Sequence, residues 1–393
     1  MYIGYWSFSD GLSLSTIRPH LIELSNFDEV KSITYISIER ASECKIFDWD
    51  IPKVKHRPFL SKPRLFFLDK IYELFNFPRK ATEICKKDNI DFVLCRSSMA
   101  GIYGYQIWKE LKIPYAVESF EPHADYMRVS GVWNKSGLRY RIQKYFEKKQ
   151  KETAKVLLPL TNAYKNALIK EGIGEDKLIV FPCTVDVDKY RFNVASREEI
   201  RNELGISQDR PVGIYVGKKG GMYYDSEIFR FFRYLYKELP SIVFLIITTQ
   251  EKIDWKEGFK QVSVPESNFI IFQSSFDEVP NYLSAADFAF NFHRSSEVSQ
   301  AFSPIKNREY WANGLPIIMG EYIGDDSDFI SANYCGITTS IESPDFDNKD
   351  LLELLNGSHR NQNVLLLASK VPNESIIRDI YLKVFAIINN IEV

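Results

Sequence analysis

The chain has 393 residues, a net charge of −2, 45% hydrophobic and 14% aromatic residues, so it is too long for one hydrophobic core and too apolar to be disordered. The charge is uneven, because residues 1–190 hold 30 Lys and Arg against 24 Asp and Glu, whereas the remainder holds 20 against 28. Two domains that face different partners are therefore expected, and a nucleic-acid partner is disfavoured by the overall balance and the lack of a known module.

The cysteines and the apolar runs restrict where the protein works. The five cysteines, at positions 44, 85, 95, 183 and 335, form no CxxC pair. Such a set indicates reduced thiols in a cytosol rather than a disulfide framework or a zinc site. The start, MYIGYWSFSDG, lacks the basic region and long apolar run of a signal peptide, and the longest apolar run, IVFLII, is too short to span a bilayer. We expect a soluble, cytoplasmic protein that sits on the inner membrane face at most.

Short apolar runs alternate with helical patterning along the whole chain. In the first half they are YIGYW (2–6), ITYISI (33–38), FVLC (92–95), YAVES (115–119), VLLPL (156–160) and LIVFP (178–182). In the second half they are VGIYVG (212–217), IVFLIIT (242–248), FIIF (269–272), FAFNF (288–292), LPIIM (315–319) and GITTSI (336–341). Near-continuous apolar strands separated by helices are typical of parallel sheets covered on both faces. The pattern predicts an α/β protein with two doubly wound parallel-sheet domains.

The domain boundary is expected near TVDVDKYRFN (184–193), directly after the sixth strand. We therefore predict one domain at residues 1–188 and a second at residues 189–374. The last segment, 375–393, begins with a helix, SIIRDIYLKVFAIINNI, that no strand follows, so it can pack on either domain.

The segment SPIKNREYWANGLPII (303–318) predicts a short helix before a buried strand. Ser303 suits the N-cap and Pro304 the first helical position, while Asn313-Gly314 provides a stop. The helix start then follows the strand FAFNF, near the carboxyl edge where open α/β sheets bind ligands.

Three side chains of this helix share one face. Lys306 lies in the first turn and adds a full charge to the helix N-terminus, which suits a phosphate. Glu309 and Tyr310 follow at i+3 and i+4, and Glu309 lies about 4–5 Å deeper along the axis. A carboxylate at that offset suits the two hydroxyls of a ribose. The alternative is a surface helix with a simple Lys–Glu pair.

A second turn that favours anions precedes this helix in the chain. GIYVGKKGGMYYDSEI (213–228) runs from a strand through a Gly-rich turn into a helix. Its glycines permit close backbone approach, and its lysines supply cations for phosphate oxygens. Neither the GxGxxG spacing nor the Walker pattern is present, so a structural turn is the alternative. The candidate ligand-binding residues of this turn are Gly217, Lys218, Lys219, Gly220, Gly221 and Tyr223.

Taken together, these segments resemble the family-4 glycosyltransferases of the GT-B fold. SPIKNREYWANGLPII is similar to the family's SPxKxxEYxAxGxPVI block, and YVGKKGGMYYD resembles its glycine-rich donor loop. LIVFPCTVDVDKYRF (178–192) is similar to the block in which Pro-x-x-Val-Asp precedes an aromatic residue. With the strand pattern, the resemblance covers nearly the whole chain. The matching positions of the first block are Ser303, Pro304, Lys306, Glu309, Tyr310, Gly314 and Pro316.

The resemblance implies two Rossmann-like domains facing across a cleft, with the acceptor on the N-terminal one, a nucleotide-diphospho-sugar on the C-terminal one and the last helix crossing back. It implies Glu309 on the donor ribose, Lys306 with Lys218 or Lys219 on the diphosphate, and a retaining reaction without a metal or other cofactor. The family usually has a second glutamate eight residues before Glu309, where this chain has Ala301. This departure, common in the branch with the SPxK block, leaves the transferred sugar open.

Breaking a sugar–phosphate bond builds negative charge on the leaving diphosphate, so fixed cations and helix N–H groups are the main catalytic need. Lys306, Lys218 and Lys219 meet this need. Just after the strand FAFNF, Arg294 either joins them or faces solvent, and His293 either hydrogen-bonds the sugar or has a structural role in its loop.

The first domain offers its own candidates at strand ends, where loops bind and catalyse. AVESFEPHADYM (116–127) follows a strand directly, and Glu121 or His123 is expected to polarise the acceptor hydroxyl. The alternative is a capped loop with solvated carboxylates. The candidate acceptor-binding residues are Asp10, Gly11, Arg96, Glu118 and Tyr126.

Two further patterns need a separate explanation. DWD (48–50) and DVD (186–188) match the DxD metal signature of a different transferase fold, but neither follows a strand as that signature requires, so both are interpreted as structural and no metal site is expected. The basic excess concentrates in residues 53–80 and 135–155, where Lys and Arg alternate with aromatic residues. These segments either contact anionic lipid or form solvated amphipathic helices.

We therefore expect a retaining GT-B glycosyltransferase that moves a hexose-type residue from a UDP or GDP donor to a glycan or lipid-linked glycan. Bacterial surface polysaccharide, lipopolysaccharide or capsule assembly is the expected setting, implied by the resemblance alone. Two alternatives stay open, namely a nucleotide-sugar 2-epimerase of the same fold and a non-catalytic nucleotide-sugar-binding scaffold.

Overall fold

The computed structural model describes residues 1–40, 47–61, 66–356, 366–367 and 369–390. The chain divides into two compact units, which we call unit 1 (Met1–Pro182 with Glu374–Val393) and unit 2 (Cys183–Asn373). The predicted boundary, after residue 188, lies slightly further along the chain. Cys44 and part of the basic segment 53–80 fall outside the described residues. Across the residues described, no helix combines the length and the apolarity needed to cross a membrane.

Unit 1 contains a parallel six-stranded sheet in the order β4-β2-β1-β6-β7-β8. Counted along the chain, this is the order 3-2-1-4-5-6 of a doubly wound fold, which reverses between β1 and β6. The strands of the sheet are β1 (Tyr2–Ile3), β2 (Ile33–Ile36), β4 (Val54–His56), β6 (Val93–Arg96), β7 (Tyr115–Phe120) and β8 (Val156–Pro159), and β3 (Ile38–Glu39) pairs separately with β5 (Phe59–Leu60). The helices are α1 (Gly11–Thr16), α2 (Arg18–Ser25), α3 (Phe66–Lys87), α4 (Ser97–Leu111), α5 (His123–Val129), α6 (Leu138–Thr153), α7 (Asn162–Lys170) and α16 (Ile376–Ile388).

One predicted strand of this unit is wrong. Residues 178–182 run beside β8, and the Phe181 N–H donates to the Pro159 carbonyl, but the segment forms only an isolated bridge at Leu178. Pro159 has no N–H with which to return a ladder hydrogen bond, so the pairing does not extend. The sixth strand is instead β4 at the opposite edge, which the hydrophobic pattern missed because two of its three residues are polar.

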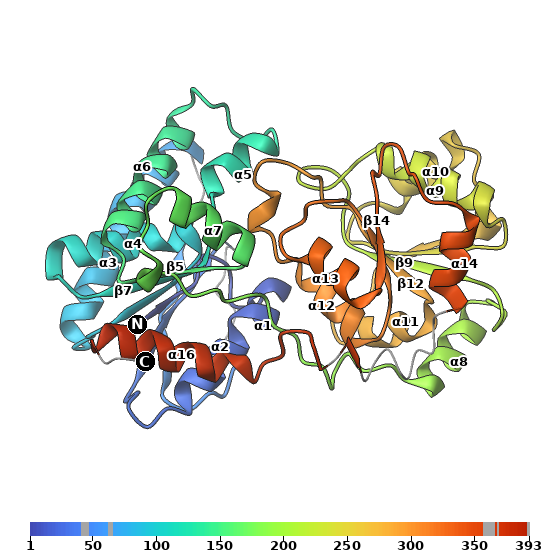
Figure 1. The fold of residues 1–393 in the computed structure, drawn as a ribbon. Coiled ribbons are helices and arrows are strands. Elements are labelled where there is room, and N and C mark those ends of the chain that lie inside the picture. Colours follow the sequence, from blue (N-terminus) through green and yellow to red (C-terminus); the bar gives the residue numbers. More distant parts are fainter. Residues whose placement is uncertain (41–46, 62–65, 357–365, 368, 391–393) are drawn as a thin grey trace. The chain divides into compact units, whose positions relative to one another are not determined.

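The last helix, α16, belongs to unit 1. Its buried residues Ile377, Ile380, Tyr381 and Val384 follow the i, i+3, i+4, i+7 spacing of one helix face. They join the core that also holds Leu21 of α2. Figure 1 shows α16, in red, beside α2, in blue. The sequence left the domain of this helix open, and its apolar stripe packs on unit 1.

Unit 2 repeats the same topology with strands β9 to β14. Its sheet has the order β11-β10-β9-β12-β13-β14, all parallel, and reverses between β9 and β12. The strands are β9 (Val212–Val216), β10 (Val243–Ile247), β11 (Phe269–Phe272), β12 (Phe288–Asn291), β13 (Ile317–Met319) and β14 (Gly336–Thr338). The helices are α8 (Val194–Glu203), α9 (Glu227–Glu238), α10 (Lys252–Gln261), α11 (Val279–Ala285), α12 (Ile305–Ala312), α13 (Asp326–Asn333) and α14 (Asn348–Asn356).

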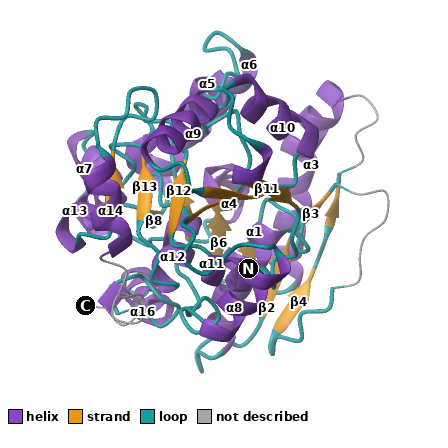
Figure 2. Ribbon diagram, turned by 90° about the vertical axis from the view of Figure 1, so that its right-hand side faces the viewer, coloured by secondary structure: helices purple, strands orange, loops and turns teal. Residues whose placement is uncertain are grey.

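All six strands predicted for the second half are confirmed in unit 2. They are nearly continuous apolar runs because helices cover the sheet, and Figure 2 shows β12, in orange, between the purple helices α9 and α11. Aromatic side chains dominate the core of this unit. Its buried phenylalanines are Phe229, Phe231, Phe232, Phe244, Phe259, Phe269, Phe288, Phe290, Phe292 and Phe346.

Candidate active site

The helix α12 is built into unit 2 rather than laid on its surface. Every residue from 307 to 312 is buried, so the predicted alternative of a solvated surface helix is wrong. The predicted stop is confirmed, because Gly314 has a φ of +76° and the Leu315 N–H donates to the Tyr310 carbonyl at 2.9 Å. A buried charged helix needs a partner for each polar side chain, and these partners define the site.

The start of α12 differs from the prediction at Ser303. Pro304 occupies the N-cap position, and no side chain caps the first turn. The Ser303 hydroxyl instead accepts hydrogen bonds from the Arg308 guanidinium at 3.0 Å and from the Cys183 N–H at 3.3 Å. A buried guanidinium competes strongly for that hydroxyl because its hydrogen bonds are charge-assisted. The first-turn N–H groups of α12 are therefore left without a side-chain cap, which suits an anion.

Lys306 and Glu309 form an ion pair on this helix. The Lys306 Nζ lies 2.8 Å from Glu309 Oε2, and the lysine side chain is about a third exposed whereas the glutamate is 1% exposed. Tyr190 lies beside Glu309, and burial together with the charge of that carboxylate raises the pKa of its hydroxyl. The ion pair with Lys306 thus engages the Glu309 carboxylate, and an anion that attracts Lys306 would release this carboxylate for another partner.

The glycine-rich loop after β9 is held against α12 and stays open at its tip. The Tyr310 hydroxyl accepts a hydrogen bond from the Val216 N–H at 3.1 Å, which joins α12 to the last residue of β9. Gly220 and Gly221 have φ angles of +86° and +67°, a region that only glycine adopts freely. A Cβ on Gly221 would meet no atom within 4 Å, so a ligand has room to approach the backbone there.

The two lysines of this loop have different environments. Lys219 pairs with Asp225 at 3.1 Å, and its backbone N–H and carbonyl both bind the Gln250 side chain. Lys218 is exposed, and the described residues offer its Nζ no hydrogen-bond or ion-pair partner. Lys218 is therefore the better placed of the two for a phosphate, a distinction that the sequence could not make.

The segment after β12 clamps the same loop. Tyr223 forms an antiparallel bridge with His293, and their rings lie 4.3 Å apart. Arg294 donates from its backbone to the Met222 carbonyl and from its guanidinium to the Tyr223 carbonyl at 3.1 Å and to Glu227 at 2.8 Å. Arg294 is thus occupied in holding the loop, which neither prediction for it had foreseen.

His293 has a distinct electrostatic setting in this segment. Its Nδ1 lies 2.7 Å from Asn291 Oδ1, and burial lowers the pKa of the ring to about 3. A histidine with so low a pKa is neutral at pH 7, so it does not supply a cation for a phosphate.

These parts meet at one place in the unit 2 sheet. The glycine-rich loop follows β9, the His293 segment follows β12, and these two strands are the neighbours between which the strand order reverses. Ligands of open α/β sheets bind outside the carboxyl ends of the strands at this reversal. The candidate donor residues predicted from sequence therefore come together at the expected position.

Unit 1 places Glu121 and His123 side by side after β7. The His123 Nδ1 lies 3.1 Å from Glu121 Oε1, and both side chains remain partly accessible. The His123 ring stacks on Tyr126 at 5.8 Å and meets the edge of Trp133 at 5.7 Å. This carboxylate–imidazole pair has the arrangement of a general base, so the structure keeps both as candidates.

Two of the predicted acceptor-binding residues, Arg96 and Glu118, are buried in the core instead. Glu118 is fully buried and is bound by the hydroxyls of Tyr2 and Tyr381, with the Arg96 guanidinium at 3.5 Å. Burial alone would raise the pKa of Glu118, but His20 and Arg96 outweigh it and hold the pKa at about 2. The geometry gives this carboxylate and its arginine a structural role, because core groups already occupy the oxygens that an acceptor would need.

The remaining acceptor candidates lie in the turn after β1. Asp10 and Gly11 are exposed, and Asp10 stands at the N-cap position of α1 without a side-chain cap hydrogen bond. A Cβ on Gly11 would meet nothing within 4 Å, so the site is open but does not require glycine. Both residues follow a strand at the reversal of the unit 1 sheet.

Backbone strain marks the same edge of unit 1 and escaped the sequence analysis. Ser97, directly after β6, has a φ of +81°, and Ser119, at an irregularity of β7, has a φ of +46°. Residues other than glycine rarely adopt such angles, and strain of this kind clusters at functional sites. No sequence signal distinguishes these two serines from ordinary turn serines.

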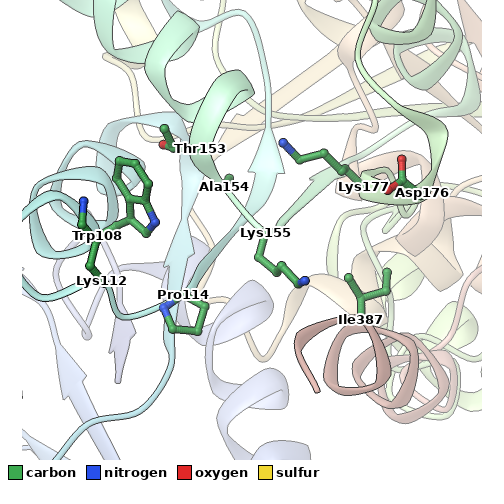
Figure 3. Close-up of a pocket in the computed structure, with 9 residues that line it drawn as sticks. All are labelled: Trp108, Lys112, Pro114, Thr153, Ala154, Lys155, Asp176, Lys177 and Ile387. Carbon is green, nitrogen blue, oxygen red and sulfur yellow. The ribbon is translucent and has the colours of Figure 1, made fainter. Parts of the chain in front are cut away.

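A cavity of about 310 Å³ in unit 1 contains none of the predicted site residues. It lies before β7 and β8, near the amino ends of the strands, whereas the candidate acceptor loops follow the carboxyl ends. Figure 3 shows Trp108 and Lys112 across this pocket from Asp176 and Lys177. Within the described parts of the chain, no group of three His, Cys, Asp or Glu side chains could hold a metal ion.

No model of a known protein family matches the chain, and no curated protein matches its sequence. Solved structures match it along nearly the whole length. Sucrose-phosphate synthase from Thermosynechococcus elongatus superimposes with a TM-score of 0.70 at 14% identity, covering 98% of each chain. HepE of Anabaena, in complex with UDP-glucose, superimposes with a TM-score of 0.68 at 13% identity, again covering 98% of each chain.

The chain has the GT-B fold. Proteins of this fold are not all transferases, because the UDP-GlcNAc 2-epimerase of Neisseria meningitidis, bound to UDP-GlcNAc, also superimposes, with a TM-score of 0.59 at 12% identity and 99% of each chain covered. At these identities the likeness establishes the GT-B fold, and the chemistry has to be argued from the residues of this chain.

Proposed function

We propose that the protein is a retaining glycosyltransferase of the family-4 type, in its SPxKxxEY branch, which transfers a sugar from a UDP or GDP donor. In this proposal unit 2 binds the nucleotide-diphospho-sugar and unit 1 binds a glycan or lipid-linked glycan acceptor. The setting is bacterial surface polysaccharide, lipopolysaccharide or capsule assembly, and the reaction needs no metal. Support for a UDP donor comes from the UDP-sugar complexes of proteins with the same fold.

The observation that carries the proposal is the Lys306–Glu309 pair at the uncapped start of α12. The donor diphosphate would accept hydrogen bonds from the first-turn N–H groups and take the charge of Lys306 and Lys218. Glu309, no longer paired with Lys306, would bind the ribose hydroxyls. As the sugar–phosphate bond breaks, the same cations stabilise the charge that develops on the leaving diphosphate.

On the acceptor side, Glu121 and His123 are the proposed polarising pair. His123 would accept a hydrogen bond from the acceptor hydroxyl, and Glu121 would orient the ring through its Nδ1. Asp10, at the N-cap position of α1, and Tyr126, on α5, are the further acceptor candidates. Their hydroxyl and carboxylate groups suit a sugar acceptor.

A lipid-linked acceptor would bring unit 1 to the inner membrane face. The support is helix α6, where Leu138 and Tyr145 are more than half exposed among basic side chains. Such a mixture of exposed apolar and cationic groups is typical of helices that lie on anionic lipid. Vesicle co-sedimentation of the protein with and without anionic lipid would test this part of the proposal.

The alternative with a specific observation behind it is a nucleotide-sugar 2-epimerase, because an epimerase shares the fold and holds its substrate as a UDP-sugar. An epimerase needs no acceptor. A non-catalytic scaffold would bind the nucleotide-sugar and leave it unchanged.

One experiment separates these possibilities. The purified protein is incubated with UDP- and GDP-sugars in EDTA, with and without a pool of glycan acceptors, and the sugar is followed by NMR. We expect a new glycoside with the anomeric configuration of the donor, formed only when acceptor is present. Isomerisation without acceptor would establish the epimerase, and binding without turnover would favour the scaffold.

A further inference from the structure

A buried network of hydrogen-bonded polar side chains, which we call the polar network, runs through unit 2 from α13 to His293. Asp326 Oδ2 accepts a hydrogen bond from Asn307 Nδ2 at 2.7 Å, and Asn307 Oδ1 accepts one from Asn291 Nδ2 at 2.7 Å. Asn291 Oδ1 in turn lies 2.8 Å from the backbone N of His293 and 2.7 Å from its Nδ1. Asp326, Asn307 and Asn291 are all less than 5% exposed.

Both ends of the polar network fix the direction of its hydrogen bonds. Burial raises the pKa of Asp326, but the ion pair with the Arg308 guanidinium opposes this effect and favours the carboxylate, which accepts the hydrogen bond from the NH₂ group of Asn307. Asn307 then presents its oxygen to Asn291, which must answer with its own NH₂ group. At the other end the backbone N–H of His293 only donates, so Asn291 must present its oxygen there. The two ends demand the same orientation of both amides.

We infer that the polar network places the ring proton of His293 on Nδ1, so that Nε2 is an obligate hydrogen-bond acceptor for a hydroxyl of the donor sugar. Asn291, Asn307 and Asp326 are then positioning residues that act through His293. The inference rests on the proposed function for the identity of the ligand, whereas the position of the proton follows from the hydrogen bonds alone.

The surroundings of the ring leave Nε2 for a ligand. Within the described chain no protein group hydrogen-bonds to this nitrogen, while the rings of Tyr223 at 4.3 Å and Phe302 at 5.7 Å hold the imidazole plane. Phosphate oxygens are themselves acceptors, so a neutral Nε2 cannot bind the diphosphate. A sugar hydroxyl can donate to it, and the loop that carries His293 lies at the reversal of the sheet beside the glycine-rich loop.

The first test reads the proton directly. The protein is labelled with ¹⁵N-histidine, and the signal of His293, one of five histidines, is assigned by its loss in the His293→Gln variant. We expect a protonated Nδ1 and an unprotonated Nε2 at neutral pH. A proton on Nε2, or a charged ring, would overturn the inference whatever the protein turns over.

The second test separates sugar recognition from nucleotide recognition. Binding of UDP-glucose, GDP-mannose, UDP and GDP is measured by calorimetry for the wild type, His293→Ala and His293→Gln. For the sugar-nucleotide that the wild type binds, His293→Ala should weaken affinity about tenfold, the loss of one hydrogen bond, and leave the free nucleotide within about twofold. His293→Gln, whose amide oxygen can accept in place of Nε2, should recover most of the loss. Equal losses for nucleotide and sugar-nucleotide would overturn the sugar contact.

The positioning residues are tested with Asn291→Leu, which removes the acceptor for Nδ1. We expect part of the ring proton to move to Nε2, with a loss of sugar-nucleotide affinity smaller than in His293→Ala and again no comparable loss for the free nucleotide. An unchanged Nδ1 proton in a folded variant would overturn the role of Asn291. If the wild type binds no nucleotide or nucleotide-sugar at all, the proposed function fails while the result on the proton stands.

Discussion

At the residue scale, the central feature is the Lys306–Glu309 ion pair near the start of α12. Lys306 neutralises Glu309, which is almost completely buried, and so removes the cost of an isolated carboxylate. Under the proposed function, the donor diphosphate attracts Lys306 and the ribose offers Glu309 two hydroxyl donors.

Replacing Glu309 by alanine should weaken binding of the donor nucleotide by tenfold or more, because the ribose hydroxyls lose a charged acceptor. Calorimetric titration of the nucleotide-sugar measures the effect. Glu353→Ala is the matched control, since Glu353 forms an exposed i, i+4 pair with Lys349 in the same unit. A change within about threefold for Glu309→Ala, less than 1 kcal/mol, would show that the ribose lies elsewhere.

Sequence reasoning at this scale named candidate residues but could not name their partners. Lys218 and Lys219 are indistinguishable in the sequence, and only the fold shows that Lys219 is paired with Asp225 while Lys218 is exposed. Serine is a favoured N-cap residue, yet the hydroxyl of Ser303 accepts a hydrogen bond from the guanidinium of Arg308, which the helix brings near. Such competition depends on packing between neighbouring turns and is not encoded in any local pattern.

At the element scale, unit 1 uses buried carboxylates to join its elements. Glu147 of α6 accepts a hydrogen bond from the Ala124 N–H at 2.8 Å, and so fixes the start of α5, the helix that carries His123. Burial raises the pKa of Glu147 to about 7. Glu118 of β7 binds the hydroxyl of Tyr381 and so fastens α16 to the sheet.

The Glu147 contact predicts a pH dependence of stability with a definite sign. The folded-state pKa lies above the ordinary value of 4.5, so its stabilising contribution is complete below about pH 4.5 and is lost as pH rises through about 7. Relative to Glu147→Gln, which stays neutral, the wild type should lose up to about 3 kcal/mol of unfolding free energy between pH 5 and 8. Urea unfolding of both proteins across this range measures the difference. A difference that does not change with pH would contradict a raised pKa.

The contact at Tyr381 predicts that Tyr381→Phe destabilises unit 1. The variant leaves the buried Glu118 carboxylate with one donor fewer, which costs about 1–3 kcal/mol. Chemical denaturation followed by circular dichroism measures the loss, and Tyr145→Phe, at a half-exposed position on α6, serves as control. Equal stability of the two variants would mean that α16 is held by its apolar face alone.

At the scale of the whole molecule, the alternation of apolar strands and helices predicted the α/β class, the second sheet completely and most of the first. It failed at the edges, where β4 is too polar to detect and the segment 178–182 is apolar without being a strand. The unit of the last helix was also beyond the sequence, because an apolar stripe states that a helix is buried but not against what. The enclosed state of Glu118 depends on this helix and was therefore missed as well.

The candidate loops at the reversal of each sheet could be named from the sequence, whereas the polar network beneath them could not. The glycine-rich turn and the start of α12 can be identified by their composition, because glycine and lysine at strand ends are typical of phosphate-binding loops. Asn291, Asn307 and Asp326 carry no such signal, because their hydrogen bonds depend on three elements meeting in the core. The candidate loops of such a fold can thus be predicted from local sequence, whereas the buried side chains that support them cannot.

We predict that Lys218 contributes to donor binding and that another exposed lysine of unit 2 does not. Lys218→Ala should weaken donor binding several-fold and do so more at low ionic strength, because an exposed charge is screened by salt. Lys256→Ala, on α10, provides the control. Affinities that are the same for the two variants would remove Lys218 from the site.

The measurement that tests the central claim most directly is the thermal stabilisation of the purified protein by UDP-, GDP-, ADP-, CMP- and dTDP-sugars in the presence of EDTA. We predict that one nucleotide class raises the melting temperature of the wild type, and that Lys306→Ala and Glu309→Ala reduce the shift strongly. No stabilisation by any of these donors, or an equal shift in all three proteins, would contradict a nucleotide-diphospho-sugar site at the start of α12.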